Sequence, residues 1–134
     1  MEDSMEISTL IAALAGSVAA MVLGGIWYSP VFFGSAWQRL ASVPDSAQAN
    51  PLLTYGGAFA LIFVGAIVFG AFIGTSPDIG FAVSAGLGAG VAWAAGSLWI
   101  SYIFEGRPLR LALINGGFHI LQYGLIGLAF GFLG

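Results

Sequence analysis

Four long apolar runs, with every proline between them, constrain the fold of this chain most. The runs cover residues 7–28, 52–74, 81–104 and 109–133, and the segments between them hold Pro30, Pro44, Pro51, Pro77 and Pro108. Proline ends helices, and each run has about the 20 residues that a helix needs to cross a bilayer. Because the runs lack the alternation of barrel strands, we predict an all-α integral membrane protein, a bundle of four transmembrane helices in a single domain over residues 1–134.

The composition excludes several classes of protein. Hydrophobic residues make up 59% of the chain and charged residues 7%, which is too little polar surface to cover a soluble core. With three basic residues and a net charge of −3, the chain has no surface for nucleic acid. No cysteine and one histidine leave neither a disulfide nor a convincing metal site, so we expect no metal and no cofactor.

The arginines predict the orientation in the membrane. Arg39 lies in the first connection and Arg107 and Arg110 flank the third, whereas the second connection and both ends have none. By the positive-inside rule, the first and third connections are cytoplasmic and both ends of the chain lie outside. The residues before the first run are acidic where a signal peptide would be basic, so we expect that run to be retained.

Aromatic residues gather where the first run ends. Trp27, Tyr28, Phe33 and Trp37 lie there, and Phe33, Trp37 and Leu40 recur at helical spacing. We interpret this segment as an amphipathic helix that follows the first span and lies flat in the membrane interface, with the aromatic rings as anchors. An aromatic wall around a cytoplasm-facing pocket is the less supported interpretation, because interfacial Trp and Tyr are common for physical reasons alone.

Small residues recur every four positions on three of the runs. Such ladders let helix backbones approach closely, either within the chain or between two copies of it, and packing within the chain is at least as well supported. The ladders are Ala12, Gly16, Ala20 and Gly24 on the first run, Ala66, Gly70 and Gly74 on the second, and Ala82, Gly86, Gly90 and Ala94 on the third.

Part of the sequence recurs. Residues 16–34 align with residues 88–106 at seven identities in nineteen positions, among them Trp27 with Trp99. The pattern indicates two repeated helix hairpins related by an axis along the membrane normal.

Polar residues on the last run form the candidate site. Asn115, His119 and Gln122 are spaced four and three apart, so they share one narrow helix face near the bilayer centre. Because unpaired polar groups are costly in hydrocarbon, this face should point into the bundle or a subunit interface. It is either a polar pocket that responds to protons through His119 or an interhelical hydrogen-bond clamp with His119 neutral, and the clamp is slightly favoured. Counted along their runs, Ser97, Trp93 and Ser17 lie at about the depth of Asn115 or His119 in the membrane, so we add them to this polar intramembrane site.

The third connection holds a candidate anion contact. Arg107 and Arg110 flank the start of the last run, where free backbone N–H groups also attract anions. We predict that an anionic lipid binds there. The better supported alternative is a topology signal with an ion pair from Glu105.

Three motifs carry a family resemblance. They are GxWYSPxxFGxxW over residues 25–37, FExRPL over residues 104–109 and INxGFH over residues 114–119. In that order they make the chain similar to the small bacterial membrane proteins of the domain of unknown function 1761 family. The resemblance implies a multi-pass four-helix protein of the bacterial inner membrane, and it supplies no activity and no catalytic residues.

Three classes of function fit these observations. Binding or transport of a small solute through the polar site on the last helix is narrowly favoured. An accessory or assembly subunit of a larger membrane complex comes next, because the chain has little mass outside the bilayer. An intramembrane enzyme that pairs His119 with Ser17 or Ser97 ranks third, since no catalytic constellation is recognisable. A chain this small needs partners to enclose a pathway, so besides the lipid bilayer we expect a homo-oligomer or another membrane protein.

Overall fold

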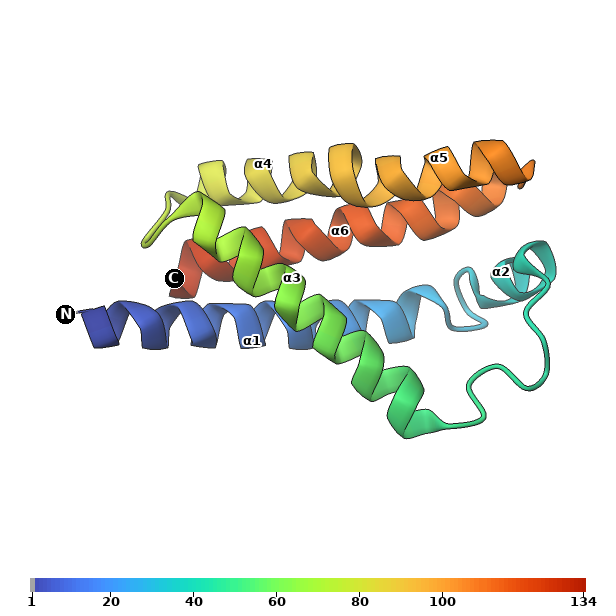
Figure 1. Ribbon diagram of the computed structural model, residues 1–134, viewed down its shortest axis with the longest axis horizontal. Coiled ribbons are helices and arrows are strands. Elements are labelled where there is room, and N and C mark those ends of the chain that lie inside the picture. The colour runs from blue at the N-terminus through green and yellow to red at the C-terminus, as the bar shows by residue number, and fades with distance from the viewer. Residues whose placement is uncertain (1) are drawn as a thin grey trace.

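The computed structural model describes residues 2–134, with side chains from Glu6 onward, and its regular structure over that range is helical. Helix α1 is followed by the short helix α2, and two of the three later long helices contain a π-helical stretch (Figure 1). The elements are α1 (Glu2–Trp27), α2 (Gly34–Ala41), a π-helical start (Leu52–Gly56) that continues as α3 (Gly57–Ile73), α4 (Ile79–Ala89) joined to α5 (Gly96–Glu105) through a π-helical stretch (Gly90–Ala95), and α6 (Leu109–Leu133).

Four of these continuous helices are long and apolar enough to cross a membrane, which confirms the predicted number of long apolar helices. They cover Glu6–Trp27, Leu52–Ile73, Ile79–Glu105 and Leu109–Leu133, close to the expected bounds. The chain therefore has the architecture of a multi-pass membrane protein.

Helix α6 is the centre of the bundle. It packs against α1 on one side and against the rod formed by α4 and α5 on the other, and both neighbours run opposite to it (Figure 1). Helix α3 crosses α1 at an angle and has few contacts with α4 and α6. The start of α1 and the end of α6 lie at one end of the bundle, and α2 and the connection to α6 lie at the other (Figure 1).

Two glycines with left-handed backbone end helices at the turns. Gly74, at φ 82°, ends α3, and Asp78 caps α4 by accepting a hydrogen bond from the Phe81 N–H at 3.2 Å. Gly106, at φ 68°, ends α5, and the Arg107 N–H then donates to the Tyr102 carbonyl at 3.0 Å. Gly74 is therefore a turn residue and not a rung of the predicted ladder.

The other small-residue ladders face α6 and pack within the chain. A Cβ added at Gly16 would lie 3.1 Å from Ile126 Cα, and one at Gly90 would lie 2.6 Å from Ile120 Cα. On α3, Gly70 lies against the Phe130 ring. The approach at Gly90 requires a hydrogen in place of a side chain, because the opposing atom belongs to backbone, and the approach at Gly16 leaves a Cβ only tight room.

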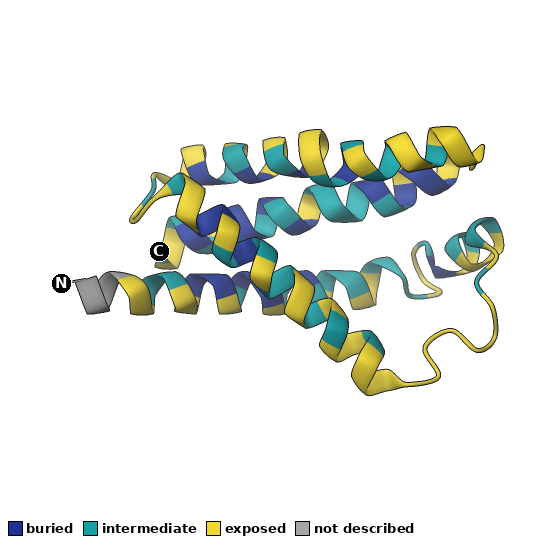
Figure 2. Cartoon of the chain, viewed as in Figure 1, coloured by how far each residue is buried: buried dark blue, intermediate teal, exposed yellow. Residues whose placement is uncertain are grey.

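The closely packed core lies toward the chain ends. Ala12, Ala66, Phe69, Ile126 and Phe130 are buried there between α1, α3 and α6, and the Phe69 and Phe130 rings meet edge to face at 6.0 Å. The first half of α3 is exposed or half-buried (Figure 2). The bundle is thus tight at one end and open at the other.

The structure matches the predicted repeat at one pair of aligned residues and differs from it at another. Trp27 and Trp99 each donate an indole N–H to a backbone carbonyl of α6. Gly16, by contrast, touches α6, whereas a Cβ at Gly88 would meet nothing within 4 Å. The two predicted hairpins also differ in how closely their two helices run together. Helix α3 diverges from α1, whereas α6 runs alongside α4 and α5 (Figure 1).

Candidate functional site

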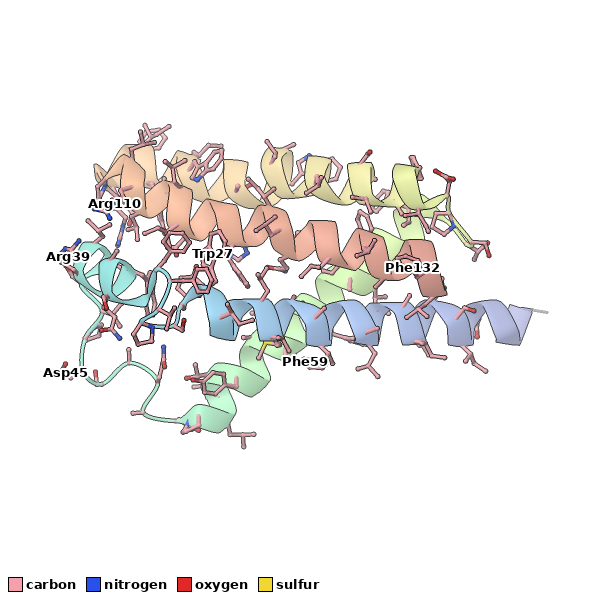
Figure 3. The ribbon with its side chains drawn as sticks, turned by 180° about the vertical axis from the view of Figure 1, so that it is seen from behind. Trp27, Arg39, Asp45, Phe59, Arg110 and Phe132 are labelled. Atoms are coloured by element: carbon pink, nitrogen blue, oxygen red, sulfur yellow. The ribbon has the colours of Figure 1, made fainter. Side chains whose placement is uncertain are left out.

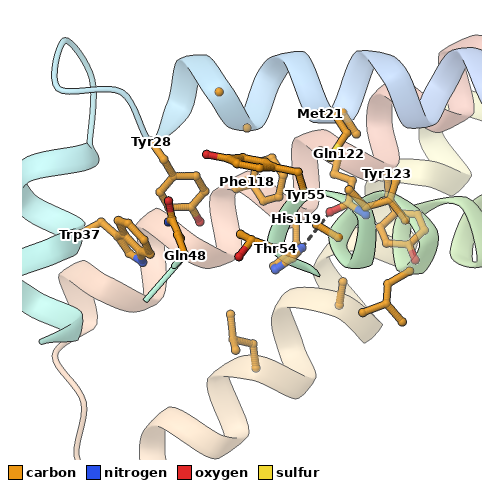
Figure 4. A pocket seen from close by; sticks show the side chains of 18 of the residues that line it. Met21, Tyr28, Trp37, Gln48, Thr54, Tyr55, Phe118, His119, Gln122 and Tyr123 are labelled. Carbon is orange, nitrogen blue, oxygen red and sulfur yellow. Dashed lines mark hydrogen bonds between the residues drawn. The ribbon is translucent and has the colours of Figure 1, made fainter. Parts of the chain in front are cut away.

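A cavity of about 910 Å³ lies between the long helices at the open end of the bundle (Figure 4). Its size suits a drug-sized molecule. None of the described side chains that line it is acidic or basic apart from the one histidine. Its hydrogen-bonding residues other than tryptophan are Tyr28, Gln38, Gln48, Thr54, Tyr55, Ser97, His119, Gln122 and Tyr123.

His119 and Gln122 form a polar pair deep in this cavity. The His119 Nδ1 lies 2.9 Å from Gln122 Oε1, and Gln122 is 4% exposed (Figure 4). With the amide oriented so, Nδ1–H donates to Oε1, which leaves Nε2 as an acceptor and the Gln122 amide N–H groups as donors. His119 follows the start of α6 by ten residues, about 15 Å along the helix and so near half the thickness of a hydrocarbon core.

Four rings form a continuous aromatic row along the cavity wall. The Trp37 ring centroid lies 5.1 Å from that of Tyr28, Tyr28 lies 5.6 Å from Phe118, and Phe118 lies 5.2 Å from His119. Each contact is edge to face, which is a favoured geometry for aromatic pairs. The aromatic row leads from α2 at the outer end of the cavity to His119.

Asn115 lies outside the cavity lining and joins two tyrosines from other parts of the chain, one in the turn after α1 and one on α5. The Tyr28 hydroxyl donates to Asn115 Oδ1 at 2.6 Å, and Asn115 Nδ2 donates to the Tyr102 hydroxyl at 2.7 Å. Burial raises the pKa of Tyr28 above its ordinary range, and Tyr102 adds to the shift, so the Tyr28 phenol stays protonated and able to donate. Asn115 therefore acts as the predicted type of interhelical clamp, whereas the other two members of its row face the cavity.

The three residues added by depth lie in different surroundings. Ser97 lines the cavity. Ser17 is buried and donates to the Ala13 carbonyl of its own helix at 2.7 Å, and Trp93 is 73% exposed on the outside of the bundle. The described geometry thus brings Ser97 to His119 and Gln122 but brings neither Ser17 nor Trp93 there.

Two tryptophan side chains donate hydrogen bonds to the backbone of α6 and pack against two consecutive glycines of that helix. Trp27 Nε1 donates to the Ile114 carbonyl at 2.9 Å, and Trp99 Nε1 donates to the Ala112 carbonyl at 2.7 Å. The Trp99 indole occupies the place of a Gly116 side chain, and a Cβ on Gly117 would lie 3.2 Å from Trp27. The indole N–H groups therefore point into the bundle.

The remaining predicted anchors pack against the end of α1. Phe33 lies 4.7 Å, centroid to centroid, from Trp27, and Trp37 on α2 belongs to the aromatic row. Gly34 begins α2 so close to the Tyr28 carbonyl that a Cβ could not fit. Whether α2 lies in a membrane interface stays a prediction, while its contact with the cavity matches the alternative of an aromatic wall.

The two arginines of the third connection differ. Arg107 Nε lies 3.4 Å from Glu105 Oε1, and its guanidinium lies 5.6 Å from the Tyr102 ring centroid. Arg110 is exposed in the first turn of α6. The expected Glu105 ion pair is present, and the anionic lipid contact stays a prediction.

Sequence reasoning missed the contribution of α3 and of the connection before it. Thr54 and Tyr55, in the π-helical start of that helix, line the cavity, as do Gln48 and Ala58. Ala94, in the second π-helical stretch, lines it as well. π-Helical turns often occur at functional sites, but their positions leave no clear periodic signal in the sequence.

The arrangement can hold an uncharged molecule by hydrogen bonds and apolar contact. Among the side chains that the structure describes, from Glu6 to Gly134, no three of His, Cys, Asp or Glu come together as metal ligands would. His119 is hydrogen-bonded to Gln122, and Ser17 donates to a carbonyl of its own helix.

Removal of the Asn115 side-chain amide should weaken the bundle. Asn115→Leu leaves two half-buried tyrosine hydroxyls without their hydrogen-bond partner, so we expect a loss of about 1–3 kcal/mol in the free energy of unfolding in detergent. Tyr28→Phe should cost less, because one hydrogen bond is lost and Tyr102 keeps its partner. Equal stability of Asn115→Leu and the parent protein would contradict the clamp.

Residues 11–131 match the family described as protein of unknown function (DUF1761), and the chain belongs to that family. The match confirms the resemblance carried by the three sequence motifs. No curated protein and no solved structure matches the chain.

Proposed function

We propose that this member of the DUF1761 family binds a small uncharged molecule in the cavity beside His119 and Gln122. The observation that carries the proposal is a cavity of about 910 Å³ with a polar pair at depth and no acidic or basic wall residue besides the histidine. Polar groups at the middle of an apolar bundle are costly, and open hydrogen-bonding positions there favour a function.

Charge restricts the kind of molecule. A charged solute in an apolar surrounding needs an opposite charge or several hydrogen bonds to offset its lost hydration. The cavity wall offers neither an arginine nor a carboxylate. The packed core of α1, α3 and α6 closes the other end of the bundle, which supports binding more directly than passage across the membrane.

Native mass spectrometry of the protein, extracted from its own membranes with lipid retained, tests the proposal. We expect a reproducible small mass bound to the chain or to a homo-oligomer. Stoichiometric unrelated chains with no bound small molecule would contradict the proposal and would favour an accessory subunit.

We further propose that the protein lies in the bacterial inner membrane with both chain ends outside the cytoplasm. Support comes from the arginines, because Arg39 and Arg110 lie at the same end of the bundle (Figure 3), and Arg107 lies in the connection next to Arg110. The acidic residue Asp78 caps α4 at the opposite end of the rod formed by α4 and α5.

A reporter fusion checks this orientation. Alkaline phosphatase, which is active only outside the cytoplasm, should be active when fused after Gly134 and inactive when inserted in the connection before α3, for example after Ser46. The reverse pattern would contradict the orientation.

A further inference from the structure

We infer, on the basis of the proposed binding function, that the bound molecule is a lipid-soluble ring compound with a hydroxyl group, and that it enters sideways from the bilayer between α3 and α5. Three features of the cavity carry this inference: the hydrogen bonds that it offers, the shape of its wall and the place where it opens.

The His119–Gln122 pair defines the polar group that the bound molecule carries. Nε2 of His119 is left to accept a hydrogen bond, and the amide N–H groups of Gln122 are left to donate. A hydroxyl both donates and accepts, so it satisfies the two residues at once. A hydrocarbon would leave both unsatisfied, and a carboxylate would bring a charge that the wall does not neutralise.

The aromatic row defines the rest of the molecule. Trp37, Tyr28, Phe118 and His119 present consecutive rings along one wall. Ring compounds pack well against ring edges and faces, and the long row leaves room for an attached apolar chain that runs toward α2. A hydroxyl on the ring would reach His119 while the chain extends away from it.

The opening lies at the depth of the hydrocarbon core. Helix α3 packs on α1, with few contacts elsewhere, so its first half stands apart from α5. Leu61 on α3 and Ser97 on α5 both line the cavity and are both exposed, Leu61 by 76%. Leu61 lies nine residues into its continuous helix, about 13 Å from the helix start. A molecule dissolved in the lipid therefore meets this opening directly.

Photolabelling with three matched probes tests the ligand class. The probes are para-hexylphenol, hexylbenzene and para-hexylbenzoate, each with a diazirine in the alkyl chain, applied to the full-length protein in lipid vesicles. We expect the phenol to label peptides of α6 and α2 at least tenfold more than hexylbenzene or the benzoate. The preference should disappear in a His119→Phe/Gln122→Leu double variant that stays folded.

Equal labelling by the phenol and hexylbenzene, or stronger labelling by the benzoate, would overturn the ligand class. A small mass retained from native membranes, without this phenol preference, would overturn only the ligand class and leave the proposed binding function standing. Absence of any retained small molecule would instead remove the proposed function.

The route is tested by closing the gap between α3 and α5. The chain has no cysteine, so Leu61→Cys/Ser97→Cys carries the only two thiols, which a short bifunctional maleimide can join. We expect joining to slow phenol labelling at least tenfold compared with the same double variant whose two thiols are each capped by a monofunctional maleimide. Unchanged labelling in the joined protein would overturn entry between α3 and α5 and would place the route at the α2 end.

Discussion

Gly86→Ala is expected to lower the stability of the folded bundle by about 1–3 kcal/mol, the usual cost of overpacking. Its added Cβ would collide with the Tyr123 carbonyl oxygen on α6 and lie 2.9 Å from the carbonyl carbon. Backbone atoms at the centre of a helix cannot swing aside as a flexible side chain can, so α4 and α6 would have to separate. Reversible unfolding in mixed detergent measures the loss.

Gly88→Ala is the matched control two residues along the same helix. A Cβ there meets nothing within 4 Å, so we expect a change within about 0.5 kcal/mol. Similar losses for the two variants would contradict packing of α4 on α6 within the chain. A loss at Gly88 alone would indicate that the opposite face of α4 binds another chain.

The His119→Phe/Gln122→Leu double variant is expected to retain at least tenfold less of the small molecule that copurifies with the parent protein. Loss of hydrogen bonds worth about 1.4 kcal/mol or more gives a tenfold change in affinity. Changing both partners together leaves neither of them unpaired in the interior, so the fold should survive. Quantitative mass spectrometry of the denatured extracts measures the retained molecule.

The two earlier interpretations of this pair give different results. If His119 and Gln122 only clamp the bundle, the double variant changes stability and leaves the retained molecule unchanged. Ser84→Leu, an exposed polar-to-apolar change on α4 away from the cavity, serves as the matched control and should leave both unchanged.

The long helices could be predicted because their signal is local. Apolar length and proline positions bound the helices to within a few residues. The structure adds the exact ends, with Asp78 as the cap of α4 and Gly106 after α5. The divergence of α3 could not be predicted in this way. The contacts of α3 with the rest of the bundle, such as Phe69 with Phe130 of α6, join side chains far apart in the sequence.

The polar row was predictable only in part for the same reason. Helical spacing places Asn115, His119 and Gln122 on one face, but the tyrosines that bind Asn115 come from the turn after α1 and from α5. Depth along a helix says nothing about rotation around it, so Trp93 was grouped with His119 although it points outward. The aromatic cluster after α1 likewise leaves two interpretations open in the sequence. The structure places Trp37 on the cavity wall, and the location of α2 in a membrane interface stays a prediction.

The most direct measurement of the central claim is the amount of small molecule retained by Ala58→Trp compared with Ala60→Trp. Both alanines are exposed on α3, but only Ala58 lines the cavity. An indole at position 58 should fill the cavity and displace the molecule, while one at position 60 should face away and leave it bound. Native mass spectrometry with lipid retained should therefore show the bound mass in Ala60→Trp and its loss in Ala58→Trp. Equal retention by the two variants would contradict the cavity as the binding site.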